Sequence, residues 1–276
     1  MTWALPAWLT RIGYDGSPAV NLATLQQLHR CQPDAIPFEN LDVLLGRPLD
    51  LSDDGIFDKL VTAGRGGYCF ELNGLFAAGL RQLGFRVRDL AARVLLGDSD
   101  EVPPRSHRMM MVTLDGERWL VDVGFGGQTL TAPLRLMGDV VQPTPHGDFR
   151  LRCGPRGWRL ESHTASGWLP LYQFTLAAQY PADYRMANHF VASWPASHFR
   201  HRLMVARSLR DGSSRRLNNR CLSRVQGSAR QTQWLTDAAA LADTLSREFG
   251  LRLDHPRHGI PAAWLARLLA GLGEDT

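Results

Sequence analysis

Cys69 lies in a setting that suits a reactive thiol. It follows the pair Gly66-Gly67, and glycines permit a tight turn with backbone angles closed to other residues. Apolar residues then recur at helical spacing until Gly84: Leu72, Leu75, Phe76, Leu80 and Leu83. The alternative is a buried, inert cysteine, because free cysteines are among the most buried residues. We expect Cys69 at a helix N-terminus, where unpaired N–H groups and the helix dipole favour a thiolate.

A β-hairpin is predicted further along the chain. The pair Asp115-Gly116 separates two runs rich in β-formers, Arg108–Leu114 and Glu117–Val123. Asp-Gly between such runs is one of the strongest short-range hairpin signals. A two-residue turn fixes the register, so that Asp122 lies opposite Met109 unless a bulge intervenes.

This register brings a histidine next to an acid. His107 lies two residues before Met109 and shares its face of the strand, so His107 and Asp122 become diagonal neighbours about 7–8 Å apart at the backbone. A lone histidine is more often structural than catalytic, but cysteine, histidine and aspartate together form a nucleophile, a base and an orienting acid. His29 is expected on a helix among polar residues. The other histidines without a carboxylate placed so directly include His146, His163, His198 and His201.

Glycines follow the candidate acid in the run Val121-Asp122-Val123-Gly124-Phe125-Gly126-Gly127. The run is neither a dinucleotide-binding fingerprint nor a Walker loop, and an ordinary strand exit is the alternative interpretation. Such glycines could let a phosphate-bearing substrate approach the backbone beside the thiol.

An acid and an arginine lie upstream of Cys69. Glu39 is set among apolar residues in Ile36–Leu41 and is either a surface charge or a partner of Arg65. The pairing would hold the loop before Cys69 through a bidentate contact that lysine could not reproduce.

The composition is that of an ordinary globular protein. The chain has 276 residues, 44% hydrophobic and 21% charged, with a net charge of +4. The arginines are scattered, which does not indicate a nucleic-acid surface, but a basic balance suits a small polyanionic substrate.

The cysteine spacing and the N-terminus bear on the compartment. The four cysteines lie far apart without a C-x-x-C pair, which argues against a zinc site or a disulfide framework. The N-terminus lacks a basic region followed by an apolar run, and no stretch approaches the ~20 apolar residues of a membrane span. We therefore expect no metal and a reducing, cytoplasmic setting.

The hydrophobic period divides the chain into three parts. Residues 1–84 are expected to be helical, residues 85–193 to form a small antiparallel barrel or sandwich, and residues 194–276 to mix strands and helices. One early helix should end before Pro33 and another should begin near Ser52. Further expected strands are Phe149–Cys153, Trp158–His163, Trp168–Phe174, Leu203–Leu209 and Arg216–Val225. Late helices are expected over Ala238–Phe249 and from Pro261.

The ordered motifs resemble those of the arylamine N-acetyltransferases over essentially the whole chain. The motifs are Ile36–Asp42, Arg65–Glu71, Arg105-Ser106-His107 and Val121–Gly127. Gln128–Leu134 and Ser197–His201 are similar to the bacterial branch described as N-hydroxyarylamine O-acetyltransferases.

The resemblance implies an α+β fold with a cysteine-protease-like Cys-His-Asp core. A helical domain (1–84) would carry Cys69, a β-barrel domain (85–193) would carry His107 and Asp122, and an α/β domain (194–276) would act as a lid. Acetyl-CoA would be the donor, an arylamine, hydrazine or N-hydroxyarylamine the acceptor, and the protein a monomer or homodimer. Residues implied near coenzyme A are Ser106, Gly126 and Gly127, and those implied to line the acceptor pocket are Phe38, Val94, Phe125 and Phe199.

Two other readings stay open. A cysteine hydrolase could use the same triad and let water resolve the acyl-enzyme, although the glycine loop and the phenylalanines favour a nucleotide thioester and an aromatic acceptor. A non-catalytic binding protein with this fold would require an unreactive Cys69.

Overall fold

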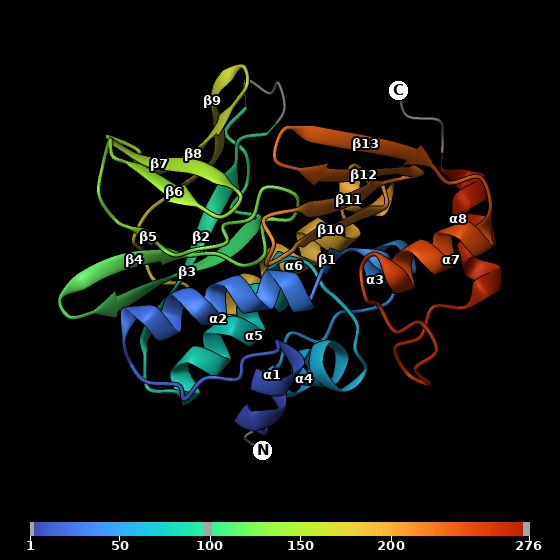
Figure 1. Cartoon of the computed structure of the whole chain (residues 1–276), viewed down its shortest axis with the longest axis horizontal. Helices are drawn as coiled ribbons and strands as arrows, with labels where there is room; N and C mark the ends of the chain where they lie inside the picture. Colours follow the sequence, from blue (N-terminus) through green and yellow to red (C-terminus); the bar gives the residue numbers. More distant parts are fainter. Residues whose placement is uncertain (1–2, 97–100, 273–276) are drawn as a thin grey trace.

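The computed structural model describes residues 3–96 and 101–272 (Figure 1). The helices α1, α2, α4 and α5 lie together below two β-sheets, with the eight-stranded sheet on one side and the five-stranded sheet, flanked by α7 and α8, on the other. The first part of the chain contains α1 (Leu5–Arg11), α2 (Leu22–Ala35), α3 (Leu41–Leu44), α4 (Asp53–Phe57), the π-helical turn Asp58–Thr62 and α5 (Cys69–Gln82).

Helix α2 corrects one expectation and α4 confirms another. The helix α2 continues through Pro33 to Ala35 because the N–H of Ile36 still donates to the carbonyl of Gln32 at 2.8 Å. A proline this near a C-terminus removes one helical hydrogen bond without breaking the turn that follows. Ser52 caps α4 as predicted, since its hydroxyl accepts from the N–H of Gly55 at 3.1 Å.

The eight-stranded antiparallel sheet forms a nearly closed barrel. Its strand order is β5-β4-β3-β2-β9-β8-β7-β6, with β2 (Arg86–Val94), β3 (His107–Leu114), β4 (Glu117–Val121), β5 (Leu134–Arg135), β6 (Val141–Thr144), β7 (Gly147–Gly154), β8 (Gly157–Thr164) and β9 (Gly167–Phe174). The edge strands β5 and β6 are linked because the side-chain amide of Gln142 both accepts from and donates to the backbone of Arg135 at 2.7 and 2.9 Å. The short strands β5 and β6 were not predicted.

The hairpin of β3 and β4 has the predicted register. Leu114 pairs with Glu117 and Met110 with Val121. Asp115 and Gly116 have φ values of 50° and 79°, which is the pattern of the turn that matches strand twist in two-residue hairpins. The strand β4 ends at Val121, so Asp122 lies just beyond the ladder.

The five-stranded sheet joins both ends of the chain. Its order is β1-β10-β11-β12-β13, with β1 (Phe38–Glu39), β10 (Met204–Ser208), β11 (Ser214–Asn218), β12 (Cys221–Gln226) and β13 (Ala229–Trp234). The expected single strand Arg216–Val225 is wrong, because Asn219 adopts a φ of 50° and turns the chain between β11 and β12. Helices α7 (Ala238–Arg247) and α8 (Ala262–Gly271) lie close to the predicted ranges.

A helix that was not expected, α6 (Pro181–Ser193), connects the barrel to the second sheet through the short 3-10 turn His198–Arg200. Among the described residues, no helix combines the length and apolar character needed to cross a bilayer. The division of the chain at residues 84 and 193 stays a prediction.

Candidate active site

Cys69 is the first residue of α5, as the glycine and helix pattern indicated. The Glu71 carboxylate accepts from the N–H of Tyr68 at 3.0 Å and so closes the first turn. The Cys69 Sγ atom lies 3.8 Å from the carbonyl oxygen of Ser106. The thiol is therefore placed beside the start of β3, where the candidate base is located.

A buried ionic network holds the loop that precedes Cys69. Both Nε and Nη2 of Arg65 donate to Glu39 Oε1, at 3.1 and 2.7 Å, and neither side chain is exposed. Lys59 Nζ lies 2.7 Å from Asp42 and 2.7 Å from Glu71. Burial raises the pKa of Asp42, but Lys59 and Arg65 outweigh it and lower that pKa to about 2. The Glu39–Arg65 pair is thus present, and Lys59 extends it to the first turn of α5.

His107 and Asp122 are in direct contact. His107 Nε2 lies 2.7 Å from Asp122 Oδ2, and both side chains are buried. Burial lowers the pKa of His107, but Asp122 and Cys69 outweigh this effect and raise it to about 10. Burial raises the pKa of Asp122, yet the imidazole and further hydrogen bonds hold it below its usual range. The raised pKa favours a protonated imidazole, whose Nε2 faces Asp122.

Asn73 orients the carboxylate and was missed by the sequence reasoning. Its side-chain nitrogen donates to Asp122 Oδ1 at 2.9 Å, and its oxygen accepts from the N–H of Val123 at 3.0 Å. Asp122 Oδ1 also accepts from the N–H of Gly124 at 3.0 Å. Asn73 lies one helical turn after Cys69, so the i, i+4 spacing of the two residues could have predicted that they share a face.

His29 corrects the sequence interpretation. It is fully buried in α2, and its Nε2 accepts from the backbone N–H of Asp122 at 3.3 Å. Burial lowers the pKa of His29 to about 4, which keeps the ring neutral and able to accept. The expectation of a polar helix face was wrong, because His29 follows Leu25 by four residues and shares its buried side.

Aromatic rings surround the imidazole. The Phe125 and Tyr172 rings lie 5.0 and 5.2 Å from the His107 ring. Phe199 lies 5.6 Å from the ring of Tyr68 and 6.3 Å from that of Phe38. Val94, at the end of β2, is the strand partner of Tyr172. Tyr172 was not anticipated, since no motif marks it.

The glycine loop lies against the first turn of α5, next to the backbone of Cys69. A Cβ atom on Gly124 would lie 3.1 Å from the Cα of Cys69, and one on Gly126 would lie 3.6 Å from the Phe38 ring. Gly126 also has a φ of 82°, which side chains rarely adopt. A Cβ on Gly127 would meet the side chain of Arg216. The loop is therefore in close contact with several elements at once.

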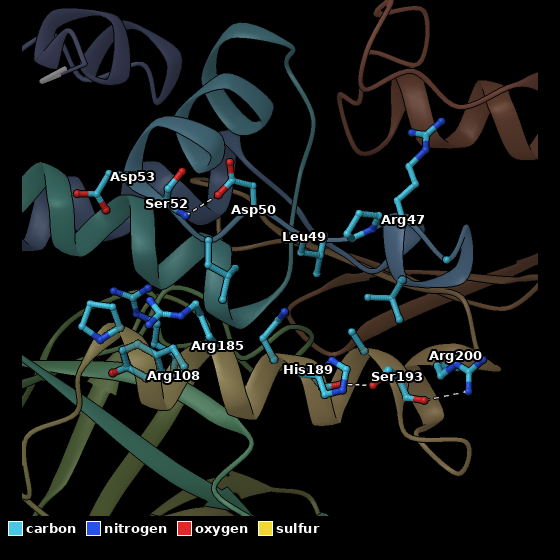
Figure 2. A pocket seen from close by; sticks show the side chains of 18 of the residues that line it. Arg47, Leu49, Asp50, Ser52, Asp53, Arg108, Arg185, His189, Ser193 and Arg200 are labelled. Carbon is cyan, nitrogen blue, oxygen red and sulfur yellow. Dashed lines mark hydrogen bonds between the residues drawn. The ribbon is translucent and has the colours of Figure 1, made fainter.

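A cleft of about 1050 Å³ lies away from this site, between the segment 43–53 and α6. Figure 2 shows Asp50, Ser52 and Asp53 on one wall and Arg185 and His189 of α6 on the other. Arg108 lines the cleft, whereas its neighbour His107 points to the opposite face of β3. The cleft does not include the triad.

A thiol at a helix N-terminus, an imidazolium and a buried carboxylate form the arrangement expected of acyl transfer through a cysteine thioester. The family described as N-acetyltransferase matches residues 21–258. The arylamine N-acetyltransferase of Escherichia coli is 45% identical over 98% of this chain and 96% of its own length. The chain belongs to the arylamine N-acetyltransferase family.

Other arylamine N-acetyltransferases agree in sequence and in fold. The Salmonella typhimurium protein, named arylamine N-acetyltransferase / N-hydroxyarylamine O-acetyltransferase, is 45% identical over 98% of this chain and 96% of its own length. A solved structure of the Salmonella typhimurium enzyme superposes with a TM-score of 0.94 at 42% identity, covering 96% of this chain and 97% of that one. The Mycobacterium marinum enzyme in complex with CoA superposes with a TM-score of 0.92 at 38% identity, covering 98% and 99%. The predicted α+β fold and the bacterial branch are confirmed.

Within residues 3–96 and 101–272, no group of three or more His, Cys, Asp or Glu side chains could hold a metal ion.

Proposed function

We propose that this protein transfers an acetyl group from acetyl-CoA to arylamines, hydrazines or N-hydroxyarylamines through a thioester on Cys69. The observation that supports it best is the Cys69–His107–Asp122 arrangement, with His107 Nε2 2.7 Å from Asp122, in a chain whose relatives are named arylamine N-acetyltransferase and N-hydroxyarylamine O-acetyltransferase.

The first half-reaction acetylates the enzyme. The Cys69 thiolate attacks the thioester carbonyl of acetyl-CoA, and collapse of the tetrahedral intermediate breaks the bond to the coenzyme A sulfur. His107 gives its proton to the departing thiolate, so that coenzyme A leaves as the thiol. Backbone N–H groups near Cys69 would stabilise the oxyanion, a contribution of roughly 3–4 kcal/mol per donor in measured cases.

The second half-reaction returns the enzyme to its starting state. The nitrogen or hydroxylamine oxygen of the acceptor attacks the Cys69 thioester, and His107 accepts the proton that the acceptor loses. The acetyl group leaves with the acceptor, and Cys69 again shares the site with a protonated imidazole. Because the two substrates use one site in turn, we expect ping-pong kinetics.

The remaining assignments belong to the same proposal. Phe125, beside His107, would form the floor of the acceptor pocket, Phe38 and Phe199 one wall, and Val94 its outer edge. Ser106, whose carbonyl oxygen lies 3.8 Å from the thiol, would approach coenzyme A together with Gly126 and Gly127. We further propose a cytoplasmic monomer or homodimer.

The proposal is tested by mixing the purified protein with acetyl-CoA alone and recording intact mass together with released coenzyme A. We expect one acetyl group on Cys69, absent in Cys69→Ser and discharged by an added arylamine. Continuous coenzyme A release without an amine would instead identify a hydrolase. The absence of both an adduct and coenzyme A release would contradict an enzymatic role and leave the non-catalytic binding protein.

A further inference from the structure

The five-stranded sheet has arginines on both faces, and the arginines of the two faces differ in their ion-pair partners. Arg215 and Arg224 are paired neighbours in β11 and β12. Both bind Glu248, which follows α7, at 3.1 and 2.6 Å. Each of these arginines therefore has a carboxylate partner on the face that packs against α7 and α8.

Arg216 lies on the opposite face because side chains alternate along a strand. One row of the sheet contains Phe38, Ala206, Arg216, Ser223 and Thr232. This row begins at Phe38, which packs in the same core as Cys69. The face with Arg216 is thus the one turned toward the proposed active site.

Arg216 has no protein partner for its charge. Its Nε is buried and makes no hydrogen bond, and among the described residues no carboxylate forms an ion pair with it. The charge that acts on it is that of another cation, Arg230, whose Nη2 donates to Ser223 at 3.3 Å. Burial and then the charge of Arg230 lower the pKa of Arg216. Partly burying the Arg216 guanidinium beside a second arginine and without an acid is costly, unless an anion binds there.

The glycine loop connects this arginine to the thiol. A Cβ on Gly127 would lie 3.1 Å from Arg216 Nε, and a Cβ on Gly124 would lie 3.1 Å from the Cα of Cys69. These two glycines are three residues apart, so their Cα atoms are at most about 11 Å apart. The loop thus lies against Cys69 at one end and against the unpartnered Nε of Arg216 at the other.

We propose that Arg216, with Arg230 beside it, binds phosphate groups of the coenzyme A moiety of the donor. A guanidinium matches phosphate through parallel hydrogen bonds, and Gly127 leaves the space that the Arg216 side chain occupies. The phosphates of acetyl-CoA are separated from its thioester by the pantetheine arm, so an anion site displaced from Cys69 along the loop suits this donor. This inference rests on the proposed function and assigns the residues that select coenzyme A over a simple thioester.

The experiment compares two donors, acetyl-CoA and the phosphate-free thioester S-acetyl-pantetheine, in the wild type, Arg216→Gln and the control Arg215→Gln. We expect Arg216→Gln to raise KM for acetyl-CoA by about 10- to 100-fold, the range for a lost hydrogen bond to a charged group, with kcat nearly unchanged. Its kcat/KM with S-acetyl-pantetheine should equal that of the wild type. Arg215→Gln should match the wild type with both donors, because its partner is Glu248 on the other face.

Binding of coenzyme A and of pantetheine, measured by calorimetry at two salt concentrations, gives a second readout. Arg216→Gln should weaken coenzyme A binding and reduce its salt dependence, and leave pantetheine binding unchanged. Arg230→Gln, at an exposed position, provides a variant whose folding is not at risk and should raise KM for acetyl-CoA several-fold.

The inference is overturned if Arg216→Gln and Arg230→Gln keep the wild-type KM for acetyl-CoA. It is also overturned if these variants raise KM for both donors equally, as expected of a purely structural role. A wild-type protein that accepts S-acetyl-pantetheine and acetyl-CoA with the same KM would also contradict it. If the wild type transfers an acetyl group from neither donor, the result would contradict the proposed function instead.

Discussion

At the scale of single residues, the site depends on how Asp122 is satisfied. This carboxylate is fully buried, and it accepts hydrogen bonds from His107, Asn73 and the N–H of Gly124. A buried charge is stable only when it is paired and hydrogen-bonded. The same contacts fix the orientation of the imidazole, so removing the charge should affect reactivity more than folding.

Asp122→Asn should reduce the rate of Cys69 acetylation by about 10³- to 10⁴-fold, by analogy with the aspartate of a serine-protease triad. The amide keeps the shape of the carboxylate but favours the wrong imidazole tautomer. Rapid-quench measurement of the acetyl-enzyme, with circular dichroism as a check on folding, tests this. Asp115→Asn in the turn of the same hairpin is the control, since asparagine tolerates its φ of 50°. Near-normal turnover of Asp122→Asn would refute the triad.

The protonation of His107 predicts how stability changes with pH. The folded protein keeps this proton up to about pH 10, whereas unfolded histidine releases it near pH 6.5. Between these values the folded state binds more protons. Its extra stability is therefore fully present below about pH 6.5 and is lost as the pH rises toward 10.

Urea unfolding of the wild type and of His107→Asn between pH 6.5 and 9.5 measures this effect. The free energy of unfolding of the wild type should fall by up to about 1.4 kcal/mol more per pH unit than that of His107→Asn, the limit for one proton. The difference in stability between the two proteins should therefore narrow as the pH rises. His189→Asn, at an exposed position, should follow the wild type. A difference in free energy of unfolding that stays constant with pH would mean that His107 is not protonated in the folded protein.

At the scale of elements, the N-terminus of α5 is positioned by ionic contacts from three preceding segments. Glu39 in β1 binds Arg65, Asp42 in α3 binds Lys59, and Lys59 binds Glu71 in the first turn of α5. Arg65 also donates to the backbone carbonyl of His258. Because these groups are buried, the hydrogen-bond geometry of each pair should contribute more to stability than its charge alone.

Arg65→Lys should lower the free energy of unfolding by about 1–3 kcal/mol, since buried acceptors lose their donors while the charge is kept. Urea titration followed by fluorescence measures the change. Arg247→Lys is the matched control, because the Arg247–Asp243 pair is exposed and exposed pairs contribute only ~0–1 kcal/mol. Equal stabilities of the two variants would show that the fork geometry of Arg65 is unimportant.

At the scale of the whole molecule, the C-terminal part is attached to the chain near the nucleophile. Strand β1, from the helical part, pairs with β10 and also bridges to Gly67 in the loop before Cys69. The Asn40 side chain donates to the carbonyls of Phe199 and Arg202, both at 2.8 Å, and accepts from the N–H of Met204 at 2.8 Å. Movements of the five-stranded sheet should therefore be transmitted to the position of the Cys69 thiol.

Asn40→Asp should loosen this attachment, because a carboxylate cannot donate to the two carbonyls. We expect amide hydrogen exchange across residues 199–208 to accelerate by about tenfold or more, the equivalent of one lost hydrogen bond. Mass spectrometry of peptides from this segment measures the rates. Asn218→Asp, at an exposed position of β11, is the control. Unchanged exchange in Asn40→Asp would mean that strand pairing alone holds the second sheet.

Features set by neighbours in the chain could be predicted from the sequence. The Asp115-Gly116 turn determines the register of β3 and β4, and that register brings His107 to Asp122 because strand geometry repeats every two residues. The start of α5 at Cys69 follows in the same way from the glycines before it and the helical spacing after it. Local backbone preferences carry this information.

Contacts between distant segments were decided only by the tertiary structure. His29 reaches Asp122 across 93 positions, Tyr172 comes from β9, and Arg216 meets Gly127 from another sheet. No turn geometry or periodicity relates such positions, since their distance depends on how complete elements pack. The sequence by itself therefore determined the candidate triad, whereas the packing of helices and sheets decided what surrounds it.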